Sequence, residues 1–413
     1  MPDSIPIPQS VSSLFGVALV LLIAFLLSTN KRAISLRVVA SAFALQLAFA
    51  VIVLYLPPGR AALATAARGV NQLLEYAGAG IAMVFGPLEG VGFSFALHVL
   101  PVIIFFAALM SVLYHVGIMP RLVAGFGWLL NRLLGTGRVE SLNAAANIFV
   151  GQTEAPLTVK PYLPKVTQPQ LFAIMTSGLA SVAGSVLAGY AQLGISVEYL
   201  LAASFMSAPG GLLMAKIIMP DEKGAPAEPQ DLIKIKPDDG RHANVIMAAA
   251  MGAKDGLWLA LNVGAMLIAF VSLIALLNGL LGWAGGFAGL DGLTIQTILG
   301  YLFSPLMYAL GIPVEEVVRA GGILGEKVIV NEFVAFISLS GTMEEFSPRT
   351  QAILTFALCG FANLSSIGIL LGGLGSLIPE RMSQIARFGL LAVAAGTLSN
   401  LMSAALAGLL FIP

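Results

Sequence analysis

The sequence predicts an all-α membrane protein with eight spanning helices and two helical hairpins that enter from opposite faces. Of its 413 residues, 58% are hydrophobic and 10% are charged, whereas roughly a quarter of the residues of a soluble domain are charged. Apolar runs of about 20 residues, the length that crosses a bilayer as a helix, recur along the whole chain. Polar interruptions of these runs recur in two parts of the chain, in the same order.

The apolar runs give eight candidate spans. Lys31, Arg32 and Arg37 follow the first span, Arg121 follows the third, and Arg381 precedes the last. Because loops rich in Lys and Arg stay in the cytoplasm, we expect these loops to be cytoplasmic. An even number of spans then places both termini outside the cytoplasm. The spans lie near 12–29, 38–56, 98–118, 171–192, 198–218, 255–283, 351–373 and 387–411.

Three segments between the spans are not expected to cross the membrane. Segment 220–244 is rich in Pro, Asp, Glu and Lys, which predicts a solvated cytoplasmic loop. Segments 119–137 and 291–312 are apolar on one face and carry charges or proline elsewhere. That pattern is typical of amphipathic helices that lie in the membrane interface.

Segments 139–166 and 317–347 are each about as long as a span, but polar residues interrupt them near the middle. The interruptions lie in "NIFVGQTEAP" and "VIVNEFVAF". A backbone that is broken in this way must be buried in protein or line a cavity. Both ends of the first segment are expected in the cytoplasm and both ends of the second outside it. The two segments are therefore predicted to be re-entrant hairpins of opposite orientation.

The order of elements repeats after each hairpin. A span with a small, polar break follows, "GLASVAGSVLAGY" at 178–190 and "ALCGFANLSSIGILLGG" at 357–373, and then another span. The elements start from the inside in the first half and from the outside in the second, which makes an inverted repeat. In secondary transporters, interrupted segments at corresponding positions of two halves mark the binding site.

Two carboxylates, Glu154 and Glu332, fall at the hairpin breaks. An ionisable side chain at that depth is costly and by default marks a substrate or ion pathway. The alternative is a structural ion pair with a buried Lys or Arg. Gln152 and Thr153 precede Glu154, and an amide, a hydroxyl and a carboxylate suit a polar ligand such as a heterocyclic base, an amide or a sugar.

Neutral oxygen donors gather around the first hairpin break. Asn147 lies one turn before it, and Ser181 lies in the break of the following span. Val150 and Val182 lie where interrupted helices leave backbone carbonyls free. Hard oxygen donors without a cluster of charge suit a monovalent cation such as sodium. An equally weighted alternative is that these groups only satisfy the broken backbones.

The second half offers Phe361, Asn363 and Ser366 in "GFANLSSIG", together with Asn331 and Glu332 at the hairpin. An aromatic ring stacks on a flat ligand, and a carboxylate and an amide can bind a pair of adjacent hydroxyls. Together these groups match a ribose that carries a base. Ordinary helix packing would be the simpler interpretation of a lone Phe.

Several other classes of function are disfavoured. The net charge is zero and the basic residues are scattered, so there is no nucleic-acid-binding pattern. Cys359 is the single cysteine, which excludes an internal disulfide and a cysteine metal cluster. His98, His115 and His242 are dispersed, without spacing that suits zinc.

The motifs also resemble those of a known family. "NIFVGQTEAPL", "NEFVAF" and "ALCGFANLSSIGILLGGLGSL" closely resemble the signature segments of the bacterial concentrative nucleoside transporters. The likeness runs from "STNKRAISLR" near residue 30 to "GTLSNLMSAALAG" at the C-terminal end. The resemblance implies a homotrimer in the bacterial inner membrane, whose eight-span protomers hold a scaffold region and a transport region that moves like an elevator.

The resemblance further implies roles for single residues, as base contacts, ribose contacts and ion ligands. By the match of the motifs, the nucleobase would contact Gln152, Thr153 and Glu154, with Val186 and Leu259 as apolar walls and Phe361 packed against the nucleoside. The ribose hydroxyls would be held by Glu332, Asn363 and Ser366. Sodium would be bound by Asn147, Ser181 and the carbonyls of Val150 and Val182.

We therefore predict a sodium-driven symporter for nucleosides such as uridine, with the sodium ion as its cofactor and without enzymatic activity. One alternative is proton coupling through Glu154 or Glu332, and another is an intramembrane enzyme that uses these two groups as acid and base. The expected regions are a scaffold at 1–118 and 255–316, a transport region at 119–219 and 317–413, and a cytoplasmic loop at 220–254.

Overall fold

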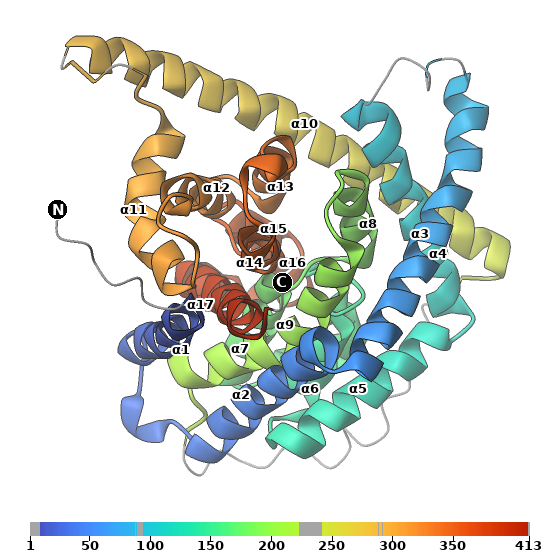
Figure 1. Cartoon of the computed structure of the whole chain (residues 1–413). Coiled ribbons are helices and arrows are strands. Elements are labelled where there is room, and N and C mark those ends of the chain that lie inside the picture. The colour runs from blue at the N-terminus through green and yellow to red at the C-terminus, as the bar shows by residue number, and fades with distance from the viewer. Residues whose placement is uncertain are drawn as a thin grey trace.

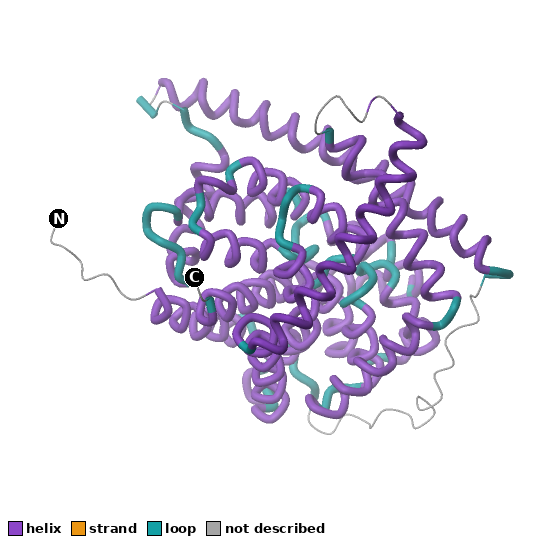
Figure 2. Tube along the Cα trace, turned by 45° about the vertical axis from the view of Figure 1, so that its right-hand side comes forward, coloured by secondary structure: helices purple, strands orange, loops and turns teal. Residues whose placement is uncertain are grey.

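The computed structural model describes residues 9–86, 88, 94–222, 242–287, 289–290 and 292–411. All regular structure in these ranges is helical, as Figures 1 and 2 show, which confirms the predicted all-α class. Most of the hydrophilic segment 220–244 lies outside the described residues.

The helices of the first half follow the predicted elements, with one addition. The addition is α3, which the sequence analysis left unassigned because Arg60, Arg68 and Glu75 interrupt its apolar character. Pro57 and Pro58 occupy its first turn, where a helix needs no N–H. The helices are α1 Gln9–Leu26, α2 Leu36–Ala50 with a π-helical continuation Val51–Tyr55, α3 Pro57–Phe85, α4 Leu100–His115 preceded by a π-helical turn Phe95–Val99, α5 Ile118–Leu134, α6 Arg138–Ala146, α7 Gln168–Ala180, α8 Gly184–Gln192 and α9 Val197–Ile218.

The second half begins with a 43-residue helix, α10, which runs along the top edge of the molecule in Figure 1. It starts ten residues before the predicted span, where the side chain of Asn244 accepts a hydrogen bond from the Met247 N–H at 2.8 Å and so caps the helix. The helices are α10 Val245–Phe287, α11 Ile295–Ala309, α12 Val317–Ile329, α13 Glu332–Gly341, α14 Pro348–Leu358, α15 Ser366–Gly372, α16 Leu374–Leu377 and α17 Met382–Leu410.

Six helical stretches within the described residues are long and apolar enough to cross a membrane. They correspond to the second to sixth and the eighth predicted spans. The first predicted span forms a shorter apolar helix, and a break divides the seventh into α14 and α15. The structure thus confirms several apolar helices, while the exact number of crossings stays a prediction.

Both predicted hairpins consist of two helical arms that pack together across a polar break. In the first, α6 is followed by a non-helical tip and a 3-10 arm at Ala155–Lys165. In the second, α12 and α13 meet at Val330 and Asn331. The Asn331 Oδ1 accepts a hydrogen bond from the Val334 N–H at 2.9 Å and so starts α13. Entry of the hairpins from opposite membrane faces stays a prediction.

The two spans predicted to be broken are both interrupted. Residues 181–183 separate α7 from α8, and residues 359–365 separate α14 from α15. The sequences restart helices in the same way in both halves, because Thr167 caps α7 and Ser347 caps α14, each with a proline in the first turn. Hairpin, broken helix and long helix therefore follow in the same order twice.

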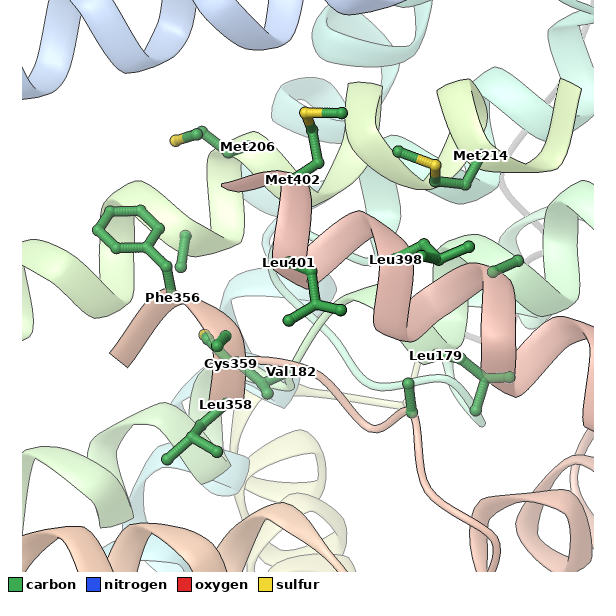
Figure 3. Close-up of a cluster of buried hydrophobic side chains, with 14 of the residues drawn as sticks. Leu179, Val182, Met206, Met214, Phe356, Leu358, Cys359, Leu398, Leu401 and Met402 are labelled. Carbon is green, nitrogen blue, oxygen red and sulfur yellow. The ribbon is translucent and has the colours of Figure 1, made fainter. Parts of the chain in front are cut away.

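The interior of the molecule is built from α7, α9, α14 and α17. Figure 3 shows Leu179, Met206, Phe356 and Leu401 from these four helices among one cluster of buried side chains. The helices α1 and α2 pack on α17 and α9 respectively. By contrast α10 exposes a row of large apolar side chains, Trp258, Leu261, Ile268, Leu276 and Trp283. Such an apolar surface is what contact with lipid or with another apolar surface requires.

Candidate functional site

The tip of the first hairpin lies against the break between α7 and α8. The Gly184 N–H donates a hydrogen bond to the Phe149 carbonyl at 3.0 Å. An added Cβ on Gly178 would lie 3.0 Å from Cβ of Gln152 and 3.8 Å from Oδ1 of Asn147. A side chain at residue 178 would therefore require Gln152 to shift. The close approach brings the hairpin residues and the helix break, which are some 30 positions apart, to one place.

The four residues predicted to bind sodium lie at this junction. Asn147 is 1% exposed, and its Nδ2 donates to the Asn143 carbonyl at 3.0 Å, whereas its Oδ1 has no hydrogen-bond partner among the described residues. The Ser181 hydroxyl donates back to the carbonyls of Ser177 and Gly178 in the last turn of α7, at 3.1 and 3.3 Å. Val182 is fully buried, and Val150 is half-buried at the tip. A buried, unpartnered acceptor is costly unless a donor or a cation fills the position.

The predicted base-contacting residues point in different directions. Gln152 is buried, and no residue in the described part of the chain forms a hydrogen bond with its Oε1. Thr153 faces the second half, since a Cβ added to Gly373 would lie 2.9 Å from its methyl group. Glu154 lies on the wall of a cavity and is exposed there. The tip thus presents an amide inward, the Thr153 methyl group toward Gly373 just after α15, and a carboxylate to the cavity.

In the second half, Glu332 is the centre of a buried hydrogen-bonded cluster. The Tyr190 hydroxyl donates to its Oε1 at 3.1 Å, and the Asn363 Nδ2 donates to its Oε2 at 3.0 Å. Tyr190 itself packs against Phe333 and Phe336, with ring centroids 4.7 and 4.3 Å away. The carboxylate therefore has a fixed position in an apolar surrounding, where hydrogen bonds to a charge are strong.

The amide of Asn363 is oriented by its neighbours. Its Oδ1 accepts hydrogen bonds from the Ser365 hydroxyl at 2.7 Å, from the Ser366 N–H at 2.9 Å and from the Ser366 hydroxyl at 3.0 Å. The Nδ2 is then left to donate to Glu332. Three of the predicted ribose contacts, Glu332, Asn363 and Ser366, are thus brought together by the structure.

Direct contacts join the two halves. The Phe361 N–H, in the break after α14, donates to the Ser181 carbonyl in the break after α7 at 3.1 Å. From α17, the Asn400 Nδ2 donates to the Ala180 carbonyl at 2.7 Å and to the Cys359 carbonyl at 2.9 Å, and so joins the ends of α7 and α14. The predicted ion ligands and the predicted ribose contacts therefore belong to one connected region.

A cavity of about 1040 Å³ lies between this region and the helices α4, α5 and α10. Of the predicted residues, Val150, Glu154 and Leu259 line it, and Ser185 and Asp255 contribute further polar groups. Gln152, Val186, Glu332 and Asn363 do not line it, and Val186 is packed in the buried core. The structure thus places Leu259 across the cavity from the hairpin tip but does not place Val186 on its wall.

Three polar residues of this region were not predicted from the sequence, namely Tyr190, Lys327 and Asn400. Tyr190 lies in "GLASVAGSVLAGY" and Asn400 lies in "GTLSNLMSAALAG". Each is a single polar group in an apolar helix, and the neighbouring residues in the sequence do not indicate its partner. Lys327 is fully buried on α12. A lysine five positions before an intramembrane carboxylate is a signal that could have identified it.

The structural alternative for the two carboxylates, a direct ion pair, does not hold within the described residues. The ion pairs there involve Glu140, Asp221 and Glu345, not Glu154 or Glu332. The buried pair is Lys216 with Glu140 at 2.7 Å, which fixes the start of α6 to the end of α9. No cluster of three metal-binding His, Cys, Asp or Glu side chains occurs in the described part of the chain.

Family models match three consecutive parts of the chain. Residues 15–88 match the Na+ dependent nucleoside transporter N-terminus, residues 96–196 match a model described as nucleoside recognition, and residues 199–408 match the Na+ dependent nucleoside transporter C-terminus. Together they span both hairpins and both broken helices.

Similar proteins are found in bacteria and in animals. The chain is 53% identical to the uncharacterized transporter YutK of Bacillus subtilis, over 96% of this chain and 98% of that protein. It is 49% identical to the nucleoside permease NupC of Helicobacter pylori, over 97% and 98%. It is 36% identical to the sodium/nucleoside cotransporter 1 of Sus scrofa, over all of this chain and 65% of that longer protein.

Solved structures show the same fold. CNTnw in an inward-facing substrate-bound state is 48% identical, with a TM-score of 0.92 over 97% of this chain and 98% of that chain. A double variant of CNTnw in an outward-facing state is also 48% identical, with a TM-score of 0.91 over 97% of each chain.

NupC and the sodium/nucleoside cotransporter 1 are nucleoside transporters by name, and the family models describe nucleoside transporters, which removes the alternative of an intramembrane enzyme. The buried carboxylate, amide and hydroxyl groups at the two helix breaks belong to the three sequence motifs that resemble this family. The chain is a nucleoside transporter and belongs to the concentrative nucleoside transporter family.

Proposed function

We propose that this transporter is a sodium-coupled symporter, which takes up nucleosides by alternating access. The observation that carries sodium coupling is the buried, unpartnered Oδ1 of Asn147, beside the break that holds Ser181 and Val182. A neutral amide oxygen, a hydroxyl and backbone carbonyls are hard donors of the type that a monovalent cation accepts. The descriptions of the matching family models also name sodium dependence.

The link between ion and substrate is short. A cation at the first tip would order Asn147 and the tip backbone, which carries Gln152, Thr153 and Glu154. It would also fix the Ser181 carbonyl, which accepts the hydrogen bond from the Phe361 N–H. Ion binding thus favours the arrangement that binds nucleoside, and by linkage nucleoside binding favours the ion to the same degree.

The proposed substrate contacts divide between the two hairpins. Gln152, Thr153 and Glu154 contact the nucleobase, with Leu259 and Val186 as apolar neighbours and Phe361 against the nucleoside. The ribose hydroxyls bind to Glu332, Asn363 and Ser366. One of them then donates to the Glu332 oxygen that accepts from the Tyr190 hydroxyl in this structure. A fixed carboxylate that accepts from two adjacent hydroxyls distinguishes a ribose from a sugar that lacks one of them.

Transport is proposed to displace the hairpins and broken helices against α3, α4 and α10, in the manner of an elevator. Helices α1 and α2 pack on α17 and α9, so we place them with the moving region, although the sequence alone assigned residues 1–118 to the scaffold. The exposed apolar face of α10 suits a membrane environment and the contacts of a homotrimer. We place the protein in the bacterial inner membrane with both termini outside the cytoplasm.

Uptake of labelled uridine into proteoliposomes tests the coupling. A sodium gradient without a pH gradient should drive the accumulation of uridine. An inside-negative potential should increase the driving force for this accumulation by about 2.3 kcal/mol per charge per 100 mV. The control imposes a pH gradient in sodium-free buffer. Accumulation under the pH gradient alone would contradict sodium coupling and favour the proton-coupled alternative, in which Glu154 or Glu332 titrates.

A further inference from the structure

The second half contains a buried lysine for which the proposed transport mechanism has no role. Lys327 lies in the last turns of α12 and is fully buried. Its Nζ donates to the Ala357 carbonyl at 2.9 Å and to Oδ1 of Asn400 at 2.7 Å. A buried ammonium group is costly unless acceptors surround it, so these contacts must be maintained in the folded protein.

The acceptors of Lys327 lie where a helix attracts a cation. Ala357 is in the last turn of α14, whose carbonyls form the negative end of the helix dipole. The side chain of Asn400 also contacts both helix ends, because its Nδ2 donates to the carbonyls of Cys359 and Ala180. Lys327 is thus connected to the ends of both interrupted helices.

The corresponding place in the first half carries no fixed charge. There the entering arm α6 contacts the last turns of α7 through Asn143, whose Nδ2 donates to the Ser177 hydroxyl at 3.0 Å, and through Asn147. The Oδ1 atoms of both asparagines are buried and have no hydrogen-bond partner within the described ranges. In each half, the first arm of the hairpin therefore contacts the end of the helix that precedes the break. In the first half this contact includes the unpartnered oxygens of Asn143 and Asn147, and in the second half it includes the ammonium group of Lys327.

Glu332 lies five residues after Lys327 along the chain, and opposite charges on these two groups attract each other. The two groups form no direct ion pair within the described residues. Glu332 instead keeps its two oxygens for Tyr190 and Asn363. The lysine can therefore balance the carboxylate without occupying the oxygens that are proposed to bind ribose.

We propose that the Lys327 ammonium group is a fixed cation, which takes at the second helix break the place that sodium takes at the first. In this role Lys327 is a positioning residue. It holds the end of α14 and keeps Glu332 in place whether or not sodium is bound, so that only the first break responds to the ion. The inference rests on the proposed sodium coupling.

The test uses the purified full-length protein in detergent and measures uridine affinity by calorimetry over a range of sodium concentrations. Lys327→Met replaces the ammonium group by an apolar side chain of similar length and removes the donor to the Ala357 carbonyl and to Oδ1 of Asn400. We expect the variant to elute and unfold thermally as a folded protein, yet to bind uridine at saturating sodium about tenfold more weakly or worse. Binding equal to that of the wild type would overturn the proposal.

Lys327→Ala adds a second readout that separates charge from volume. Propylammonium should restore part of the lost uridine affinity, whereas 1-propanol, which has a similar size and no charge, should not. Equal restoration by both compounds would assign the effect to packing and overturn the proposal. The wild type in the same two compounds is the control.

The two hypotheses fail differently. Uridine binding by the wild type that does not depend on sodium would contradict the proposed coupling. Sodium-dependent binding by the wild type, together with unchanged affinity in Lys327→Met, would contradict the role of Lys327 alone.

Discussion

At the scale of single residues, the site depends on buried polar groups with few alternatives. Glu332 has both carboxylate oxygens bonded, and Asn363 has its amide held by Ser365 and Ser366. Asn147, by contrast, has an oxygen without a partner. Substitutions at these positions should therefore affect substrate and ion separately.

Glu332→Gln is expected to weaken uridine binding by about tenfold to a hundredfold, because a hydrogen bond to a charged group contributes about 1.5–3 kcal/mol. In one orientation of the new amide its NH2 group would face the Asn363 NH2, a donor against a donor, and in the other it could donate only to the Tyr190 hydroxyl. Calorimetry at saturating sodium measures the loss. Tyr190→Phe is the matched control, since it removes one donor and leaves the carboxylate, and should cost about 1 kcal/mol or less. Equal losses in the two variants would contradict the role of Glu332.

Asn147→Ala should raise the sodium concentration that gives half-maximal uridine binding by about tenfold, the effect of losing one oxygen ligand worth roughly 1.4 kcal/mol. Uridine affinity at saturating sodium should change little, because Asn147 is not a proposed substrate contact. Sodium titrations at fixed uridine measure both quantities. A variant with wild-type sodium dependence and weak uridine binding would reverse the assignment.

At the scale of elements, the function depends on how the hairpin tips contact the helix breaks. An added Cβ at Gly184 would lie 2.9 Å from the Phe149 carbonyl oxygen, the acceptor of the Gly184 N–H. The backbone on both sides would have to move, since the nearest atom is a main-chain oxygen and not a flexible side chain.

Gly184→Ala is therefore expected to weaken sodium and uridine binding together, by separating the tip from the break. Gly125→Ala in α5 is the control, because an added Cβ there meets nothing within 4 Å and an alanine favours the helix by roughly 0.5–1 kcal/mol. Sodium titrations of uridine binding and thermal unfolding compare the two variants. A loss of stability without a change in either affinity would show that the contact is only structural.

At the scale of the whole molecule, the buried elements α7, α9, α14 and α17 contrast with the exposed α10. The proposed displacement occurs between these two groups. The contact between α8 and the turn before α4 crosses this boundary, since a Cβ on Gly189 would lie 3.3 Å from a methyl group of Val99. Two cysteines at these positions would be close enough for a disulfide.

The pair Val99→Cys and Gly189→Cys, with Cys359→Ala to remove the native thiol, should form a disulfide under oxidation that stops uridine uptake. Calorimetric uridine binding should persist in the oxidised protein, because neither residue is a proposed contact. Reduction should restore uptake and is the control. Full uptake by completely cross-linked protein would contradict a displacement at this boundary.

The amino-acid sequence alone predicts the all-α class, the two interrupted hairpins, the two broken helices and the polar residues at each break. These features are local, because an apolar run interrupted by Gly, Asn, Ser or Glu cannot remain exposed to lipid. It also indicated which residues would gather, since Glu332, Asn363 and Ser366 do form one cluster. It failed for α3, whose charges hide an otherwise continuous helix.

The three-dimensional structure alone shows which distant groups meet. Tyr190 contacts Glu332 across 142 positions, and Lys327 contacts Asn400 across 73. It also placed Glu154 on a cavity wall while Val186 is packed in the core. Contacts of this range depend on how helices pack, and a single polar residue in an apolar helix carries no local information about its partner.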